Sequence, residues 1–230
     1  MIALLLIACG PLAVQPIHEA PGDTAVSSAV DADPDSDGFS TSEELDAGSD
    51  PQYRFSWDFG GERWPEFSDE ADAAGFEGTG YALGEPLVNF VAVDQFDQEV
   101  SLDTFYGYVI LLDFVAGWCG PCNQAAAEAQ GQWEEQRLDG VLYVHVIVDD
   151  NVQDDVVEPG FATLWAETYD LEFPVLLEQD GATLQGLTDA GVYEGALPFT
   201  VLLDPQMQVD SSYTGAFDAA IARAATLTRN

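Results

Sequence analysis

The sequence has almost no positive charge. It contains no lysine and five arginines against 42 aspartates and glutamates, so its formal net charge at pH 7 is −37. Proteins bind nucleic acids by neutralising phosphates with lysine and arginine, and they bind anionic lipid headgroups in the same way. The composition therefore argues against both classes of partner. We interpret the acidity as a solvating surface, suited to salty or cation-rich surroundings where screening shortens charge repulsion to about 8 Å or less.

Cysteine and histidine are also scarce, with three cysteines and two histidines in the chain. Cys119 and Cys122 stand close together in the stretch FVAGWCGPCN. A structural zinc site needs about four ligands, and neither His18 nor His145 has ligand spacing to the pair, which argues against zinc. We expect His18 to be solvated and His145 to be a core histidine. A disulfide across so short a loop removes little entropy from the unfolded chain, so redox exchange explains the spacing better than a static crosslink does.

The N-terminal apolar run is too short to cross a membrane, because a spanning helix needs about 20 residues. It extends from Ile2 to Ala8 and is followed by Cys9, Gly10 and Pro11. The residues LIAC resemble the lipobox of bacterial lipoproteins, in which the signal is cleaved before a cysteine that becomes lipidated. The resemblance implies a signal peptide over residues 1–8 and a lipid anchor on Cys9, in an exported compartment where disulfides persist. No lysine or arginine precedes the run, so a misplaced start or an ordinary signal peptide remains an alternative.

The next segments predict a flexible tether and then a calcium loop. Residues 9–30 are rich in Pro, Ala, Ser and acidic residues without periodicity. Residues 31–51 read DADPDSDGFSTSEELDAGSDP, which resembles thrombospondin type 3 repeats and fills every ligand slot of an EF-hand loop. The ligands would be Asp33, Asp35, Asp37, the Phe39 carbonyl, Thr41 and Glu44. We predict bound Ca²⁺, a short helix from about Thr41 to Ala47, and a loop that stiffens the tether. A chance match in an acidic linker is the alternative.

Residues 52–80 connect the loop to a regular domain. Their aromatic side chains are expected to pack on that domain, with a peptide-binding surface as the alternative. From Tyr81 onward apolar runs alternate with helical segments, which predicts an α/β sheet with buried central strands over residues 81–230. The expected strands are 87–93, 108–115, 141–148, 173–177 and 199–203, and the expected helices are 121–137, 161–169 and 217–227.

The two cysteines follow one of these strands and open a helix. Free backbone N–H groups and the positive end of the helix dipole favour a thiolate over a thiol at Cys119. Pro121 suits the first helical turn, where a backbone N–H is not needed. We expect Cys119 to be an exposed nucleophile that attacks a partner disulfide, and Cys122 to lie further inward and resolve the mixed disulfide.

The stretch WCGPC at Trp118 to Cys122 is the thioredoxin active-site motif. Together with GEPLVNFVAVDQFDQEVSLDTFYGYVILLDFVAGWCGPC, FPVLLEQDG and ALPFTVLLDPQMQV, it resembles the membrane-tethered TlpA-like and ResA-like thiol-disulfide oxidoreductases. The resemblance implies a thioredoxin-like fold, with a central mixed sheet flanked by helices. It also implies an enzyme that needs no cofactor for its redox chemistry, acts on protein disulfides or dithiols, and is recharged by a membrane thiol donor. The Gly120-Pro121 pair is that of reducing members, which favours a reductase.

The resemblance also assigns roles to single residues. Asp113 matches the family's buried acid, which is thought to carry the proton of the resolving thiol; the alternative is an exposed carboxylate at a strand end. Pro198 matches the family's cis-proline beside the cysteines, where the backbone of Leu197 would pair with an extended substrate segment. Trp118 would shield the disulfide and form part of the docking face.

Two other functions stay open. A peroxiredoxin would have threonine three residues before its peroxidatic cysteine, but this chain has Ala116 there and its second cysteine is placed differently. A calcium-stiffened surface or adhesion protein could use a thioredoxin fold for binding alone. An intact cysteine pair favours the oxidoreductase over both.

Overall fold

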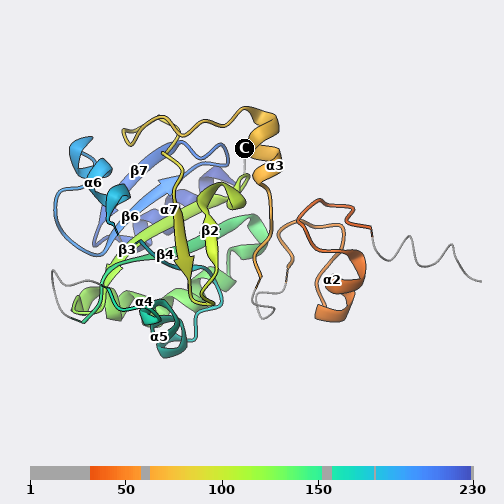
Figure 1. The fold of residues 1–230 in the computed structure, drawn as a ribbon, viewed down its shortest axis with the longest axis horizontal. Helices are drawn as coiled ribbons and strands as arrows, with labels where there is room; N and C mark the ends of the chain where they lie inside the picture. The colour runs from red at the N-terminus through yellow and green to blue at the C-terminus, as the bar shows by residue number, and fades with distance from the viewer. Residues whose placement is uncertain (1–31, 58–62, 152–156, 179, 229–230) are drawn as a thin grey trace, which may run out of the picture.

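A computed structural model gives the fold of the protein and describes residues 32–57, 63–151, 157–178 and 180–228 (Figure 1). The predicted signal peptide, the lipidation site at Cys9, the tether over residues 9–30 and His18 lie outside the described residues. Among the residues that are described, no helix has the length and apolar character needed to cross a membrane.

A single mixed sheet forms the centre of the molecule, with strand order β2-β1-β5-β4-β3-β6-β7. The middle strands β3, β4 and β5 are parallel, whereas β1, β2, β6 and β7 pair antiparallel to their neighbours. Every residue of β3 is buried, as expected for a strand covered on both faces. The strands are β1 (Val91–Asp94), β2 (Glu99–Ser101), β3 (Val109–Ala116), β4 (Val141–Asp149), β5 (Val175–Leu177), β6 (Phe199–Leu203) and β7 (Val209–Thr214).

Helices pack around this sheet and confirm the predicted α/β class. Helix α4 lies against β4, α5 against β5, and α7 against β3, β6 and β7. Figure 1 shows α4 and α5 next to each other, and shows α2 on the opposite side of the molecule from α6. The helices are α2 (Thr41–Ala47), α3 (Ser68–Ala74), α4 (Gly120–Glu134), α5 (Phe161–Tyr169), α6 (Ala182–Asp189) and α7 (Phe217–Leu227), with 3₁₀ turns η2 (Leu102–Phe105) and η3 (Arg137–Asp139).

Several predicted elements are shorter in the structure. The first expected strand begins at Val91 because Leu87 and Val88 donate their backbone N–H groups to Met207 and Gly80, outside the β1 ladder. The strand expected from residue 173 begins at Val175, after Pro174, which has no N–H to donate. The long helix ends at Glu134 and is followed by η3.

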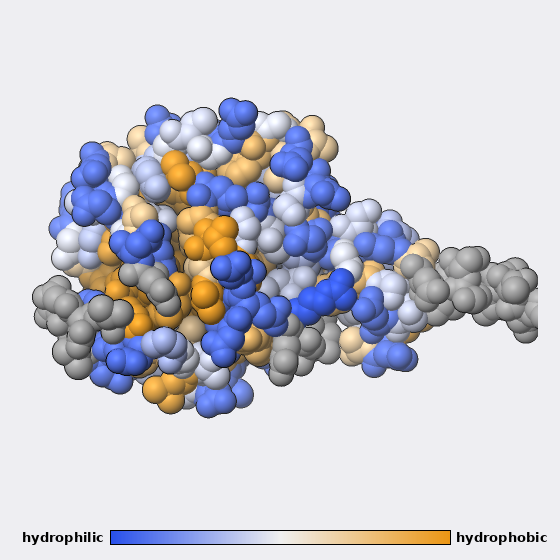
Figure 2. All heavy atoms as spheres, viewed as in Figure 1, coloured by the Kyte–Doolittle hydropathy of each residue, from blue (hydrophilic) through white to orange (hydrophobic). Residues whose placement is uncertain are grey.

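The aromatic residues of the connecting segment pack on the domain, as predicted. Trp57, Trp64 and Phe67 are all buried. The indole of Trp64 donates to the Asp94 carboxylate at 2.6 Å, and that of Trp57 donates to the Tyr108 hydroxyl. Figure 2 shows hydrophilic residues spread over this face of the molecule, in keeping with the charge of the sequence, with a hydrophobic area near the centre and lower left of the domain.

Candidate active site

Cys119 and Cys122 form a disulfide where β3 ends and α4 begins, with their sulfurs 2.08 Å apart. Cys119 is the N-cap of α4, and its Sγ accepts a hydrogen bond from the Cys122 backbone N–H at 3.2 Å. Pro121 lies in the first turn, where its missing N–H leaves no acceptor unpaired. The sequence prediction that a strand delivers the pair to a helix N-terminus is confirmed.

The outer cysteine is more enclosed than the sequence analysis expected. Cys119 is 3% exposed and Cys122 is 0% exposed, while the neighbouring Trp118 is 40% exposed. The expectation of an exposed Cys119 is therefore wrong for the disulfide form, because its sulfur is bonded to the inner sulfur of Cys122. Trp118, Gly120 and Pro121 are the exposed residues of the motif, and they form its outer surface.

The end of β4 holds the tryptophan in place. The Trp118 indole donates to the Asp149 carboxylate at 3.1 Å, and the Trp118 backbone N–H donates to the Asp150 carbonyl at 2.9 Å. Gly117 allows this close approach: a Cβ on it would lie 2.6 Å from the Phe161 ring and 2.8 Å from the Asp150 backbone. The turn before the cysteines is thus fixed on two neighbouring strands.

Asn123 fastens the cysteine turn, and the sequence analysis did not identify it. Its side-chain amide donates to the carbonyls of Gly117 at 2.9 Å and Cys119 at 2.7 Å. Its Oδ1 accepts from the Tyr169 hydroxyl at the end of α5. The sequence does hold a signal for it: an asparagine directly after the second cysteine, in the first turn of the helix. An asparagine side chain at such a position can hydrogen-bond to nearby backbone groups as both donor and acceptor.

Asp113 is buried within β3, at 1% exposure, so the alternative of an exposed strand-end carboxylate is wrong. Its Oδ1 accepts from the Thr200 hydroxyl at 2.7 Å, whereas its Oδ2 has no hydrogen-bond partner. Burial raises the pKa of Asp113 to about 7, against the smaller opposing effect of the Thr200 hydrogen bond. A carboxyl that titrates near neutrality can both accept and return a proton.

His145 on β4 is buried, as predicted, but it faces the acid. It pairs in register with Asp113, and its Nε2 is 3.9 Å from the Asp113 Oδ2. The Trp165 indole donates to His145 Nδ1 at 3.1 Å, which places the proton of the neutral ring on Nε2. Burial lowers the pKa of His145 to about 3. Because the pKa of Asp113 is raised and that of His145 is lowered, the two groups are both neutral slightly below pH 7 and form no ion pair.

The Leu197-Pro198 peptide is cis, and it precedes β6. Phe199 of β6 pairs with Phe114 of β3, so Pro198 lies at the same end of the sheet as the cysteine turn. The Pro198 carbonyl accepts from Gly215 N–H at 2.9 Å. Within the described part of the chain, neither the amide nor the carbonyl of Leu197 has a hydrogen-bond partner, and its side chain is half-buried.

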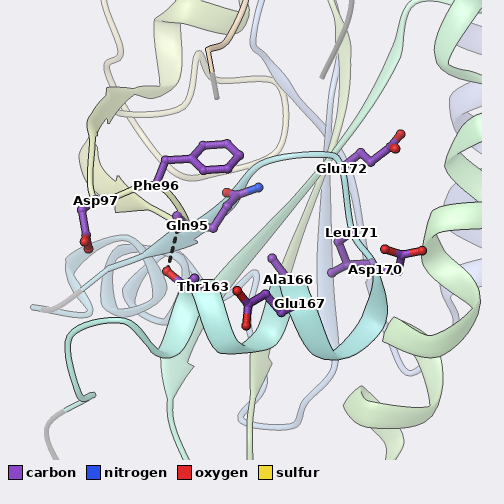
Figure 3. A pocket seen from close by; sticks show the side chains of 9 residues that line it. All are labelled: Gln95, Phe96, Asp97, Thr163, Ala166, Glu167, Asp170, Leu171 and Glu172. Atoms are coloured by element: carbon purple, nitrogen blue, oxygen red, sulfur yellow. Dashed lines mark hydrogen bonds between the residues drawn. The ribbon is translucent and has the colours of Figure 1, made fainter. Parts of the chain in front are cut away.

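The two cavities beside α5 differ in their relation to the cysteines. One, of about 130 Å³, adjoins the cysteine turn and is lined by Asn123, Asn151, Phe161, Leu164, Trp165, Thr168 and Tyr169. A larger one, of about 490 Å³, is shown in Figure 3 and shares no residue with the turn. Its Gln95 amide is bonded within the protein, to Phe173 and Val175, and its carboxylates are exposed. We assign it no role in the redox chemistry.

The predicted calcium residues are all described. They lie in a compact loop over residues 33–39 and in the first turn of α2, which contains Thr41 and Glu44. Asp37 and Glu44 are buried, Asp35 is half-buried and Asp33 is exposed. The Thr41 hydroxyl donates to the Ala32 carbonyl at 2.8 Å and keeps its lone pairs. Desolvation and neighbouring carboxylates raise the pKa of Glu44 to about 7, and desolvation raises that of Asp37 to about 6.

Known proteins are similar to this chain in sequence. The chain is 26% identical over 133 residues to the thiol-disulfide oxidoreductase ResA of Bacillus thuringiensis subsp. konkukian, which covers 58% of this chain and 70% of ResA. It is 28% identical over 140 residues to ResA of Geobacillus thermodenitrificans, which covers 60% of this chain and 73% of that protein.

Solved structures share the fold. The thioredoxin domain of a thiol-disulfide oxidoreductase from Bacteroides vulgatus superposes with a TM-score of 0.51 at 17% identity, covering 64% of this chain and 98% of that domain. The peroxidoxin BcpB of Mycobacterium tuberculosis gives a TM-score of 0.50 at 19% identity, covering 64% and 96%. The model of the AhpC/TSA family matches residues 83–226, a span that includes both cysteines. The protein therefore belongs to the AhpC/TSA family and has a thioredoxin-like fold.

Proposed function

We propose that the protein is a thiol-disulfide oxidoreductase that reduces disulfides in exported client proteins. The observation that carries the proposal is the Cys119–Cys122 disulfide at the N-terminus of α4, which follows the strand that carries the buried Asp113. The ResA relatives, which are named as thiol-disulfide oxidoreductases, support the same chemistry.

The reaction transfers two electrons from the reduced pair to the client. The Cys119 thiolate attacks one sulfur of a client disulfide, which forms a mixed disulfide and releases the first client thiolate. Cys122 then loses its proton, and its sulfur attacks Cys119, which closes the internal disulfide and releases the second client thiolate. We assign the uptake of the Cys122 proton to Asp113, because its pKa of about 7 allows it to act as a base near neutral pH. A dithiol donor at the membrane would return the pair to its reduced form.

Client binding involves the surface around the cysteines. The exposed Trp118 ring and the unpaired backbone groups of Leu197 lie at the same end of the sheet. Leu197 comes just before β6, and the first residue of β6 pairs with Phe114 near the end of β3. An extended client segment could add its backbone to Leu197, as in β-augmentation. Such binding depends on the main chain, so it would accept clients of varied sequence.

Anchoring through lipid on Cys9 is part of the proposal. It rests on the lipobox resemblance and would place the redox domain outside the cytoplasm, at a membrane surface. Metabolic labelling with a radioactive fatty acid tests it, with Cys9→Ser as the matched control. Label that persists in Cys9→Ser, or that is absent from the wild type, would contradict the anchor.

Trapping tests the redox function directly. Cys122→Ser retains the attacking sulfur but cannot resolve, so it should accumulate mixed disulfides through Cys119, whereas Cys119→Ser should accumulate none. Purified reduced wild type should also reduce insulin disulfides. If no client is trapped and insulin is untouched, the binding-only surface protein becomes the better explanation. Rapid consumption of hydrogen peroxide by the wild type without client reduction would instead favour a peroxidase.

A further inference from the structure

The loop before α2 gathers carboxylate oxygens around one point. One oxygen each from Asp33, Asp35 and Asp37 lies within 4.8 Å of the other two. Calcium binds oxygens at about 2.3–2.6 Å, so ligands on opposite sides of one ion are separated by up to about 5 Å. The three oxygens therefore fit the coordination sphere of a single calcium ion.

A second observation, the burial of unpaired acid groups, also points to a cation. Asp37 is 0% exposed and Glu44 is 1% exposed. The Oδ2 of Asp37 and the Oε2 of Glu44 are buried without a hydrogen-bond partner, as are both carboxylate oxygens of Asp35. Buried ionised carboxylates are unfavourable unless a positive charge or a donor compensates them. Neither arginine nearby bonds to these carboxylates: Arg54 pairs with Glu70, and Arg63 pairs with Glu43 and donates to the Gly38 carbonyl.

The backbone of the loop is already arranged to hold the ligands. The N–H groups of Asp37 and Gly38 donate to the two carboxylate oxygens of Asp33, at 3.3 Å and 3.0 Å. Gly38 has φ +89°, a conformation that other residues rarely adopt. The Thr41 N–H donates to the Ala32 carbonyl at 2.7 Å, which closes the loop on itself. A ligand set held in this way loses little conformational entropy when it binds.

We propose that residues 33–44 bind one Ca²⁺ ion, and that the ion fastens this loop to the thioredoxin-like domain. The ligands are carboxylates of Asp33, Asp35, Asp37 and Glu44 with the carbonyl of Phe39, and Thr41 contributes directly or through water. Calcium is favoured over magnesium because a large, all-protein oxygen shell with a closing glutamate suits the bigger and more flexible ion. The site is independent of the cysteine chemistry.

The loop contacts the domain through the segment 63–67. The Glu66 N–H donates to the Asp37 carbonyl at 2.9 Å, and the next residue, Phe67, donates its N–H to the Thr104 carbonyl at 3.0 Å. Arg63 lies over the Phe39 ring at 4.4 Å and also donates to the Gly38 carbonyl. Asp37, a proposed calcium ligand, is thus hydrogen-bonded directly to the segment 63–67, which packs into the core. The loop contacts the domain, so we infer that a bound ion would stabilise the domain in addition to stiffening the tether.

Calorimetry and thermal unfolding together test the proposal. Full-length protein is stripped with EDTA and titrated with calcium chloride, with magnesium chloride and sodium chloride of matched ionic strength as controls for general screening. We expect one saturable site with a Kd between about 10⁻⁷ and 10⁻³ M. We also expect the melting temperature of the whole domain, followed by near-ultraviolet circular dichroism, to rise with calcium concentration.

Matched variants separate a built site from general acidity. Asp35→Ala and Glu44→Gln should each weaken calcium binding at least tenfold and abolish the calcium-dependent rise in melting temperature. Asp46→Ala removes an exposed carboxylate of α2 outside the ligand set, and it should bind calcium like the wild type. Equal responses in Asp35→Ala, Asp46→Ala and wild type would overturn the site. Saturable binding that leaves the melting temperature of the domain unchanged would overturn the fastening.

Discussion

Replacing Asp113 with asparagine should change how stability depends on pH. In the native protein burial raises the pKa of Asp113 to about 7, whereas an unfolded aspartate has a pKa near 3.9. Between these values the native state holds a proton that the unfolded state has lost, so stability falls as pH rises. An asparagine side chain cannot titrate, so this loss should disappear in the Asp113→Asn variant.

The expected size follows from the difference in pKa. About three units at ~1.4 kcal/mol each give a total of about 4 kcal/mol, of which roughly 3 kcal/mol falls between pH 5 and pH 8. His145, which faces Asp113, acts in the opposite direction, because burial lowers its pKa to about 3 and stability rises with pH up to about 6.5. The other polar neighbour, Thr200, does not titrate. The contributions of Asp113 and His145 therefore nearly cancel in the wild type below pH 6.5, and only the His145 rise remains in the variant.

Urea unfolding of the oxidised protein at pH 5, 6, 7 and 8 measures this difference. The asparagine amide changes stability by an amount that does not depend on pH, so the slope of variant minus wild type isolates the carboxyl. Asp72→Asn, at an exposed position of α3, controls for the general relief of negative charge. A difference between Asp113→Asn and wild type that stays constant from pH 5 to pH 8 would refute the reasoning, since it would mean that Asp113 ionises normally in the folded protein.

Four further substitutions, one of them a matched control, test other parts of the structure. Asn123→Ala removes the contacts to Gly117, Cys119 and Tyr169 and should lower the unfolding free energy of the oxidised protein by about 2 kcal/mol in urea; a loss under about 0.5 kcal/mol would contradict its role. Gly38→Ala introduces a Cβ at φ +89° and 3.1 Å from Glu66 Cβ and should cost about 1–2 kcal/mol, whereas Gly131→Ala on the exposed face of α4, where a Cβ meets nothing within 4 Å, should gain up to about 1 kcal/mol by the same measurement. Trp118→Ala should slow the second-order rate of insulin reduction roughly tenfold while stability changes by less than about 1 kcal/mol, and an unchanged rate would remove Trp118 from the docking face.

Elements with strong local signals could be predicted from the sequence almost to the residue. Helix α2 has a capping box formed by Ser40 and Glu43, and its C-cap is Gly48 in a left-handed conformation. Both ends of this helix are therefore determined by residues next to them in the sequence. The expected bounds of β6, α5 and α7 also match. Each of these elements carries its own apolar run or periodicity.

Edge strands and short helices could not be predicted in the same way. Strands β2 and β7 read EVS and VDSSYT, without a distinctive apolar pattern. They form because their backbone groups pair with those of β1 and β6. Helices α3 and α6 were likewise not anticipated. These elements depend on tertiary pairing and packing, which a local pattern does not encode.

The same distinction applies to the candidate site. The cysteine pair and its helix were predictable because motif, strand and helix are contiguous in the sequence. The approach of His145 to Asp113 depends on the register between β3 and β4, and the contact of Asn123 with Tyr169 joins residues on two helices. Neither register nor helix packing follows from spacing along the chain.

The link from Asn123 to Tyr169 makes α5 a natural reporter of the oxidation state. Opening the disulfide removes one constraint on the first turn of α4, and a shift of that turn would be transmitted through Asn123 to the Tyr169 hydroxyl at the end of α5. The neighbouring Trp165 ring meets the Tyr169 ring edge to face with centroids 4.8 Å apart, so its emission should respond to reduction or oxidation of the disulfide. A fluorescence change on reduction would then come in part from Trp165, which lies outside the WCGPC motif. The rate of amide hydrogen exchange along α5 should change with the oxidation state as well.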